Sequence, residues 1–305
     1  MTNYRDAVLF LLLAAVWGSA FPAIKAGLEA GFEPVLFAAV RYDVAGVVML
    51  AYAARVSDRW LPRTRADWTT VGIAAVLMIA AYHAFLFVGE QQTTSAVAAV
   101  VVSLSPVLTT GFARTFLPSE RLSVAGLTGL ALGLVGVVVL SNPDPSNLLG
   151  GNTVGVLLVL SASTCFALGS VLTQRVDDDL SIETMEAWSM LLGAGLMHVA
   201  SVAAGEPQVV PRNTEALFAI GYLSLVASAL GFLVYFELLE RLGPIEINLV
   251  SYVAPVFAAI VGLVWLAEPI TPNTVAGFLV IFSGFCLLKR RALVAELRKA
   301  RAVWA

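Results

Sequence analysis

Charged side chains are scarce in this sequence of 305 residues, of which they make up 13%. Soluble domains carry charge on about a quarter of their residues, so the composition excludes an ordinary soluble domain. Hydrophobic residues make up 59%, which favours an integral membrane protein. The net charge of −3 offers no basic surface to a nucleic acid, and we expect no nucleic-acid partner.

Cysteine and histidine are also scarce, with two residues of each. Cys165 and Cys286 lie in apolar stretches without a CxxC partner, which argues against a disulfide framework and against a metal site. His83 and His198 lie within apolar runs, and no Ser/His/Asp set accompanies them. We therefore expect no metal, no cofactor and no catalytic residues. A membrane enzyme acting on lipid-linked substrates is the less favoured alternative.

Long apolar runs, by contrast, fill most of the chain. A membrane-spanning helix needs about 20 mostly apolar residues, because the hydrocarbon core is about 30 Å thick. Runs without a charged residue cover 7–24, 68–89, 91–113, 122–143, 145–174, 187–205, 216–236, 247–267 and 269–288, and a further run, 34–54, contains only Arg41 and Asp43. The sequence thus predicts an all-α membrane protein with ten transmembrane helices.

Lysine and arginine are distributed unevenly between the two ends of these predicted helices. One side of the membrane receives fifteen of the eighteen: Arg5, Arg55, Arg59, Arg63, Arg65, Arg114, Arg121, Arg175, Arg241, Lys289, Arg290, Arg291, Arg298, Lys299 and Arg301. The other side receives Lys25 and Arg212, and Arg41 lies inside a helix. Because cytoplasmic loops are enriched in these residues, we predict a multi-pass protein of the cell (inner) membrane with both termini in the cytoplasm.

Landmarks of the first half of the chain recur in the second half. An offset of 149 residues aligns Trp17 with Phe166, Gly46 with Gly195, Gly72 with Gly221 and Pro106 with Pro255, and an offset of 148 aligns Glu120 with Glu268. We predict a first five-helix repeat in 1–142, a connecting loop in 143–153, a second repeat in 154–291 and a cytoplasmic tail in 292–305. Because five is odd, the second repeat enters the membrane from the opposite side, an arrangement that recurs in transporters.

Several motifs resemble those of the EamA-type transporters of the drug/metabolite transporter (DMT) superfamily. The first half carries Val16-Trp17-Gly18-Ser19-Ala20-Phe21 with Lys25, Arg41, Ser103-Leu104-Ser105-Pro106 and Leu117-Pro118-Ser119-Glu120-Arg121-Leu122. The second half carries Leu242-Gly243-Pro244, Tyr252-Val253-Ala254-Pro255 and Glu268-Pro269. The resemblance implies a ten-helix fold around a central cavity that passes amino acids, other metabolites or drugs, often outward. Within the superfamily the chain is similar to the exporters of amino acids, aromatic ones included.

The resemblance also implies that the first and sixth helices border the pathway, so that Trp17 and Phe166 line it. Phe166 stands where the second half of family members often has tryptophan. Tyr82 and His83 lie about midway through the third predicted helix. An ionisable group at that depth indicates function. His83 could bind substrate in the cavity, carry a proton, or stay neutral and donate to a backbone carbonyl, and we favour cavity lining.

Prolines occupy equivalent positions in the fourth and ninth predicted helices. A proline within a helix frees a backbone carbonyl, so Pro106 and Pro255 are predicted hinges, with a purely structural kink as the alternative. Polar side chains accompany them on the same helices: Ser103, Asn248, Ser251 and Tyr252. These polar residues are candidate substrate ligands, although they could equally bond to neighbouring helices.

Arg41 lies about 10 Å of helix rise below the start of the second predicted helix. It could bind a substrate carboxylate. We favour a structural role, in which the guanidinium bonds to carbonyls or to a carboxylate such as Glu186.

These features together predict a secondary transporter, not an enzyme, that moves amino acids or related small metabolites by alternating access, as an exporter. Its partners are the small-molecule substrate and the lipid bilayer, and it is expected to be a monomer or a weak homodimer. An exporter of drugs or other metabolites with the same fold is the alternative.

Overall fold

The computed structural model describes residues 4–116, 124–142, 150–242, 247, 249–288 and 290, and within these ranges the chain is helical without a strand. The first half contains α1 (Tyr4–Glu29), α2 (Pro34–Val56), α3 (Arg65–Ile73), η1 (Ala74–Ala81), α4 (Tyr82–Glu90), α5 (Ser95–Val102), α6 (Ser105–Phe116) and α7 (Val124–Ser141). The second half contains α8 (Gly151–Thr173), α9 (Ile182–Ala203), α10 (Thr214–Gly221), η2 (Tyr222–Leu230), α11 (Gly231–Leu242), α13 (Val250–Leu266) and α14 (Pro272–Leu288).

Many of these elements are long and apolar enough to cross a bilayer. Among the described residues, 6 helical runs meet this requirement by length and composition: Tyr4–Glu29, Pro34–Val56, Arg65–Glu90, Ser95–Phe116, Asn152–Thr173 and Thr214–Leu242. Shorter apolar helices cover Leu127–Ser141, Val250–Leu266 and Pro272–Leu287. The chain is therefore built as an all-helical, multi-pass membrane protein, as the long apolar runs predict.

Several helices begin where the sequence supplies a capping residue. The side chain of Thr64 accepts a hydrogen bond from the backbone of Asp67, and the Asp67 carboxylate accepts one from the backbone of Thr64 in return. This reciprocal capping box satisfies donors that a helix start leaves unpaired. Ser181 and Asn213 cap α9 and α10 with single side-chain bonds in the same way.

Two long helical runs each contain a stretch of π-helix. The stretch η1 starts at Ala74 and η2 starts at Tyr222, which is 148 residues later. A π-helix bonds each N–H to the fifth preceding residue, and such stretches inside α-helices are frequent at functional sites. Their spacing matches the offset at which the two halves of the sequence align.

The fourth apolar run is broken rather than continuous. Helix α5 ends at Val102 and α6 begins at Ser105, so Pro106 is the second residue of a new helix. Proline is well tolerated there, because the first N–H groups of a helix have no partner inside it. Pro255, in contrast, lies inside α13. The two equivalent prolines thus have different helical environments.

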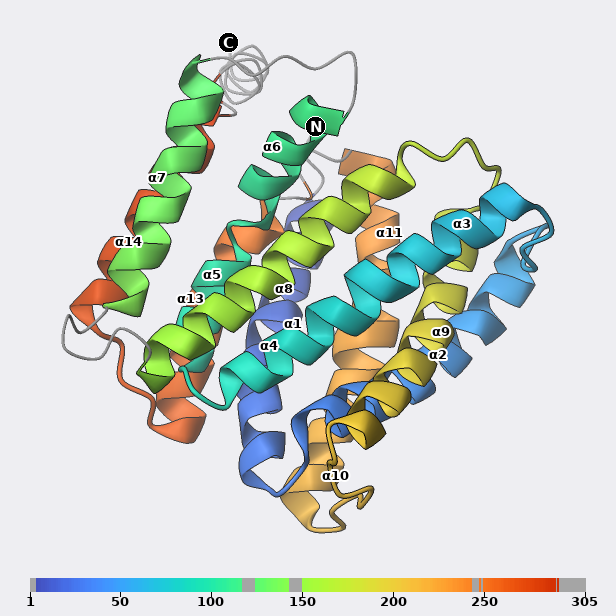
Figure 1. The fold of residues 1–305 in the computed structure, drawn as a ribbon, viewed down its shortest axis with the longest axis horizontal. Helices are drawn as coiled ribbons and strands as arrows, with labels where there is room; N and C mark the ends of the chain where they lie inside the picture. The colour runs from blue at the N-terminus through green and yellow to red at the C-terminus, as the bar shows by residue number, and fades with distance from the viewer. Residues whose placement is uncertain are drawn as a thin grey trace.

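Close packing joins the two halves at glycine contacts. Helices α7 and α14 lie side by side (Figure 1), and a methyl group added at Gly136 would come within 2.9 Å of the Gly277 carbonyl. At Gly284 it would meet Leu132 Cβ at 3.2 Å. Helices α2 and α9 also lie side by side (Figure 1). The glycines of α7 therefore serve packing within one chain, because small residues let backbones approach closely.

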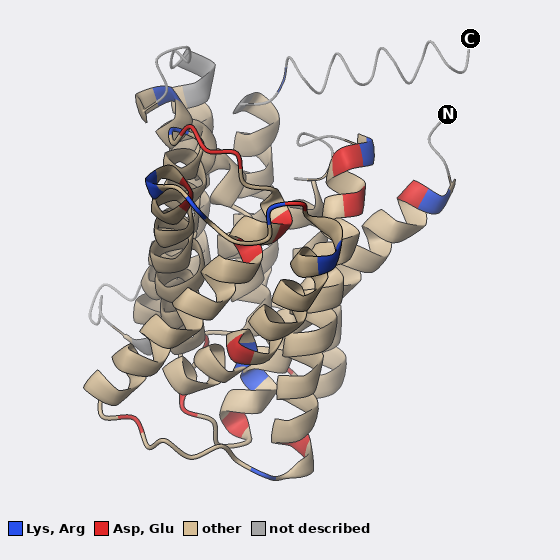
Figure 2. Cartoon of the chain, turned by 90° about the vertical axis from the view of Figure 1, so that its right-hand side faces the viewer, with Lys and Arg blue, Asp and Glu red and all other residues tan. Residues whose placement is uncertain are grey.

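The start of α1 and the end of α14 lie at the same end of the bundle (Figure 1). Charged residues gather toward the two ends of the molecule, and the middle of the described helices is almost entirely uncharged (Figure 2). This is the distribution that a bilayer requires of the helices that cross it.

Candidate functional site

Four aromatic side chains form a cluster where α2, α4 and α8 meet, and we call Tyr42, Tyr82, His83 and Phe166 the central cluster. The Tyr82 ring lies 4.5 Å from the His83 ring and 5.4 Å from the Phe166 ring, measured between centroids. The Tyr42 ring lies 4.4 Å from that of His83. The structure therefore brings together three of the residues that the sequence singled out and adds Tyr42 to them.

Both nitrogens of His83 have partners inside the protein. Nδ1 lies 2.8 Å from the carbonyl oxygen of Ile79, and Nε2 lies 2.7 Å from the hydroxyl of Tyr42. The carbonyl can only accept, so Nδ1 carries a hydrogen and Nε2 accepts from the tyrosine in the tautomer that satisfies both bonds. This is the neutral arrangement considered for His83, with the carbonyl partner supplied by the π-helix η1.

Trp17 forms a second group with residues of η2 and α11. Its Nε1 donates to the carbonyl of Ala227 at 3.1 Å, and its ring lies 5.4 Å from Tyr235 and 5.9 Å from Phe232. The 149-residue offset makes Trp17 equivalent to Phe166 and Tyr82 equivalent to Gly231. Phe166 packs on Tyr82, and in the other half Trp17 lies against Gly231, where an added methyl group would be 2.8 Å from Nε1. The larger ring, that of Trp17, thus lies against glycine, whereas the smaller ring, that of Phe166, lies against tyrosine.

The remaining sequence candidates lie apart from these two groups. The hydroxyl of Ser103 donates to the Val100 carbonyl at 2.6 Å within its own helix and is fully buried. Tyr252 packs on Phe285 of α14 at 4.2 Å. Ser251 is half-buried and its side chain forms no hydrogen bond among the described residues, and Asn248 lies outside them. The polar residues predicted to bind substrate from the fourth and ninth helices thus do not form one group with His83.

Arg41 lies directly beside the central cluster. Its Nε donates to the hydroxyl of Ser228 at 3.0 Å, and its guanidinium carbon lies 5.1 Å from the centre of the Tyr42 ring. Arg41 is 7% exposed. Among the described residues, no carboxylate lies within ion-pair distance of it. Asp43 instead faces His198 at 2.7 Å. The expected carboxylate partner of Arg41 is therefore absent from the described part of the chain.

Glu90, which the sequence analysis did not single out, is fully buried at the end of α4. Neither of its carboxyl oxygens has a hydrogen-bond partner among the described residues. The ammonium of Lys25 donates to the backbone carbonyls of Glu90 at 2.8 Å and Thr93 at 3.3 Å. The only sequence signal for Glu90 is its position directly after the apolar run 68–89. That position indicates the end of a helix and not a buried carboxylate.

Glu268 accepts hydrogen bonds from the backbone N–H of Ser95 at 3.0 and 3.2 Å. It therefore caps α5, in the other half of the chain, rather than the helix that follows it. Burial in the connection between α13 and α14 raises the pKa of the Glu268 carboxyl, and the bonds from Ser95 oppose that rise.

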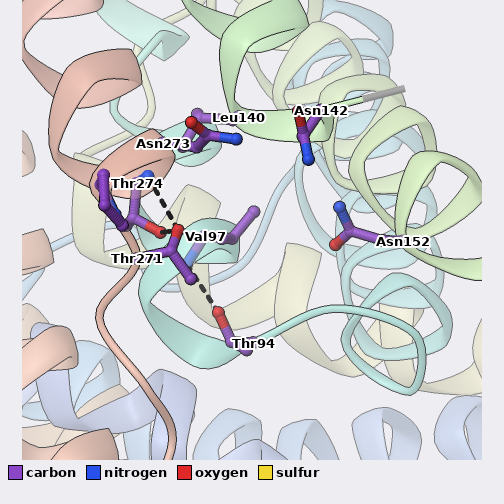
Figure 3. A pocket seen from close by; sticks show the side chains of 9 residues that line it. Thr94, Val97, Leu140, Asn142, Asn152, Thr271, Asn273 and Thr274 are labelled. Atoms are coloured by element: carbon purple, nitrogen blue, oxygen red, sulfur yellow. Dashed lines mark hydrogen bonds between the residues drawn. The ribbon is translucent and has the colours of Figure 1, made fainter. Parts of the chain in front are cut away.

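A cavity of about 390 Å³ opens at the end of the bundle where α8 and α14 begin (Figure 1). Its lining comes from four parts of the chain: Thr94, Val97, Leu140, Asn142, Asn152, Thr271, Pro272, Asn273 and Thr274. The side chains of Asn142, Asn152 and Asn273 surround it (Figure 3). None of the residues predicted to bind substrate lines this cavity.

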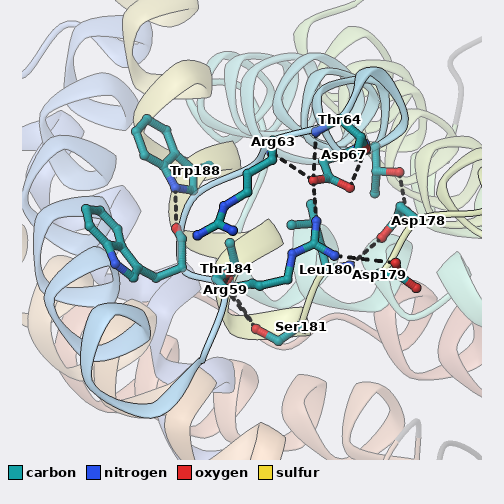
Figure 4. A network of polar contacts seen from close by, with 12 residues as sticks. Arg59, Arg63, Thr64, Asp67, Asp178, Asp179, Leu180, Ser181, Thr184 and Trp188 are labelled. Atoms are coloured by element: carbon teal, nitrogen blue, oxygen red, sulfur yellow. Dashed lines mark hydrogen bonds and ion pairs between the residues drawn. The ribbon is translucent and has the colours of Figure 1, made fainter.

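Hydrogen bonds join the two halves at both ends of the bundle. At one end the hydroxyls of Ser57 and Ser181 lie 2.8 Å apart. Ser181 also belongs to the polar network shown in Figure 4. In that network Arg59 bonds Asp67 at 2.8 Å and Asp179 at 3.4 Å. Asp178 and Asp179 thus take part in a bonded network.

At the other end, Glu206 accepts from the backbone N–H of Val35 at 3.0 Å and of Leu36 at 2.9 Å. Ser57 directly follows α2 and contacts the residue that caps α9, and Glu206 lies three residues after the end of α9 and contacts the first turn of α2. Ser57 and Glu206 are 149 residues apart. The contacts at the two ends are therefore equivalent by the repeat.

Comparisons with known proteins find relatives that span almost the whole chain. The profile of the EamA-like transporter family matches residues 6–142 and again 153–290. The uncharacterized inner membrane transporter YedA of Escherichia coli (strain K12) is 31% identical over 253 residues, which cover 82% of this chain and 79% of that protein. The uncharacterized transporter YvbV of Bacillus subtilis (strain 168) is 26% identical over 302 residues, covering 98% and 95%.

One relative has a named cargo, and one solved structure shares the fold. The probable terminal-alkyne amino-acid exporter of Streptantibioticus cattleyicolor is 28% identical over 296 residues, covering 94% of each chain. A protein of known crystal structure has a TM-score of 0.64 at 23% sequence identity, covering 95% of this chain and 99% of that one. Names of this kind indicate transporters rather than enzymes.

Proposed function

This chain belongs to the EamA-like transporter family, and we propose that it is a secondary transporter that moves amino acids or related small metabolites out of the cell by alternating access. It is a membrane transporter of the DMT superfamily, and its relatives include inner membrane transporters. A small-molecule substrate and the lipid bilayer are the partners that such a protein requires.

We propose that the protein has ten transmembrane helices in two inverted repeats of five. The double match to one family profile supports two copies of a unit. The equal spacing of η1 and η2 supports an equivalent helix in each copy. The excess of lysine and arginine on one predicted side supports both termini in the cytoplasm. The two repeats are inverted because a chain that crosses the membrane five times ends on the side opposite to its start, where the second repeat begins.

The observation that carries alternating access is the pair of equivalent contacts at the two ends. Ser57 reaches the start of α9 at one end, and Glu206 reaches the start of α2 at the other. In an inverted repeat the two halves can exchange conformations, so that one set of contacts opens while the other closes. A substrate held between the halves is then exposed to each side in turn.

The residues proposed to contact substrate are those at the centre of the bundle. Trp17, Tyr82 and Phe166 are half-buried and come from α1, α4 and α8. His83 positions Tyr42 through its hydrogen bond. We retain Ser103, Ser251, Tyr252 and Asn248 as weaker candidates, and Pro106 and Pro255 as hinge candidates, because these helices would have to move in the exchange. Aromatic side chains suit an amino acid with an apolar body.

The outward direction and the amino-acid cargo draw support from the relative named as an amino-acid exporter. The test is flux of labelled aromatic amino acids across proteoliposomes that contain the purified protein. We expect Trp17→Ala to lower the flux at least about tenfold, because it removes a half-buried ring of the site. Trp265→Ala, at an exposed tryptophan of α13, is the matched control and should leave the flux unchanged. Equal flux in both variants would remove Trp17 from the pathway.

A further inference from the structure

Arg41 is a buried cation for which the described part of the protein provides no anion. It is 93% buried, since 7% of its surface is exposed. Among the described residues, its hydrogen bond goes from Nε to the hydroxyl of Ser228, which is neutral. A charge removed from water without an opposite charge is costly, and a buried guanidinium is retained where something compensates it.

The terminal nitrogens of Arg41 remain available. Polar atoms that are fully enclosed without a partner include the oxygens of Glu90 and the hydroxyl of Tyr252, but neither Nη1 nor Nη2 of Arg41. No acceptor among the described residues bonds them either, so these two nitrogens are unpaired and each retains some accessible surface. A guanidinium presents its terminal N–H groups as a planar fork that fits a carboxylate with two parallel hydrogen bonds.

The surroundings hold this fork in place. The Tyr42 ring lies under the guanidinium, and the Tyr42 hydroxyl is fixed by His83. Ser228, whose hydroxyl fixes Nε, belongs to the π-helix η2. Arg41 is therefore oriented from two helices while its Nη1 and Nη2 stay unpaired, which is how a preorganised binding group is built.

The carboxylates nearest in the fold do not fill this role. Asp43 bonds His198, with both side chains partly exposed on the surface of α2 and α9. Glu90 is within electrostatic range of Arg41 but not within ion-pair distance. Glu186 also forms no ion pair with it. A structural role of Arg41 alone would leave it without an ion-pair partner among the described residues.

We propose that Arg41 binds the carboxylate of the transported substrate through Nη1 and Nη2, with the apolar part of the substrate against Tyr82 and Phe166. This inference rests on the proposed function, and it narrows the cargo to solutes with a free carboxylate. Ser228 is a positioning residue, because it touches Arg41 and not the substrate. Amides and amines that match the substrate in shape are then poor cargo.

The test compares phenylalanine with phenylalaninamide, which differ at the carboxylate alone. Labelled flux is measured in proteoliposomes with the full-length wild-type protein, Arg41→Gln, Arg41→Lys, Ser228→Ala and Arg55→Gln, the last at an exposed arginine of the same helix. We expect wild type and Arg55→Gln to prefer the acid by at least about tenfold. The neutral amide offers the guanidinium one acceptor oxygen and no charge, whereas the carboxylate can accept from both terminal nitrogens.

Arg41→Gln should lose at least about tenfold in kcat/KM for phenylalanine and bring the two solutes within about twofold of each other. Arg41→Lys should keep part of the preference, and Ser228→Ala should raise KM for the acid more than for the amide. An unchanged preference in a folded Arg41→Gln overturns the inference. If that variant does not fold, absence of any preference in the wild type overturns it instead. Transport of neither solute by the wild type would contradict the proposed function itself.

Discussion

The hydroxyl of Tyr42 donates to Nε2 of His83 at 2.7 Å, and the opposite nitrogen of the same ring faces the carbonyl of Ile79 at 2.8 Å. This pair links α2 to α4 and connects the guanidinium of Arg41, through the Tyr42 ring, to the Tyr82 and Phe166 side chains. The histidine is thereby fully bonded and structurally fixed at the centre of the bundle.

The first prediction concerns that hydrogen bond. Tyr42→Phe leaves Nε2 of His83 buried without a donor, which should destabilise the protein by about 1–3 kcal/mol. Tyr52 lies on the same helix and its hydroxyl forms no hydrogen bond among the described residues, so Tyr52→Phe is the control and should be nearly neutral. Thermal unfolding in detergent checks the difference. Equal midpoints for the two variants would show that the Tyr42–His83 bond contributes nothing to stability.

The second prediction concerns the packing of Trp17 on Gly231. Gly231→Ala places a methyl group 2.8 Å from Nε1 of Trp17, so the indole must move and its bond to Ala227 must break. We expect a loss of transport together with a shift of tryptophan fluorescence. Gly221→Ala, in the same helical run, meets nothing within 4 Å and should be neutral or stabilising by about 0.5–1 kcal/mol. A fluorescence spectrum that Gly231→Ala leaves unchanged would contradict the described contact.

The third prediction concerns pH. Burial raises the pKa of Glu268 above its value in the unfolded chain, so the folded state favours the protonated carboxyl. Its contribution to stability is therefore fully present below the unfolded pKa of 4.5 and is lost as pH rises through the folded value. Because Glu268 is about half exposed, the effect is small. In Glu268→Gln the midpoint of thermal unfolding should change less with pH across this window than in the wild type. In Glu215→Gln, at an exposed glutamate, the midpoint should change with pH as it does in the wild type.

The fourth prediction concerns the contact of Glu206 with the first turn of α2. Glu206→Gln weakens two charge-assisted bonds, to Val35 and Leu36. Amide hydrogen exchange in residues 35–37 should accelerate, with little change at the start of α9, which Ser57 contacts at the other end. Unchanged exchange at the start of α2 would mean that Glu206 does not hold this end closed.

Much of the fold follows from sequence because it depends on local composition. The long apolar runs predict the helices, and the resemblance to EamA-type transporters is confirmed by the family match. The broken helix before Pro106 was not expected, because proline alone does not distinguish a kink from a new helix start. The π-helices leave no sequence signature beyond their shared offset.

The candidate site could be predicted only in part. Trp17, Tyr82, His83 and Phe166 are recognisable because they are aromatic or ionisable at membrane depth. Their partners depend on which helices meet in space, so the contact of Arg41 with Ser228, 187 residues away, could not be read from spacing. The same is true of Glu90, whose isolation is a property of its surroundings. Substrate binding by these residues stays a prediction.

The central claim is that the protein carries amino acids by alternating access, and counterflow tests it most directly. Proteoliposomes are loaded with unlabelled phenylalanine and diluted into buffer with a trace of labelled phenylalanine. The account predicts transient accumulation of label above equilibrium, because a carrier exchanges inner for outer substrate through one site. Repeating the measurement with each of the other amino acids extends the test to the substrate class. Labelling no faster than in empty vesicles, for every amino acid tried, would contradict it.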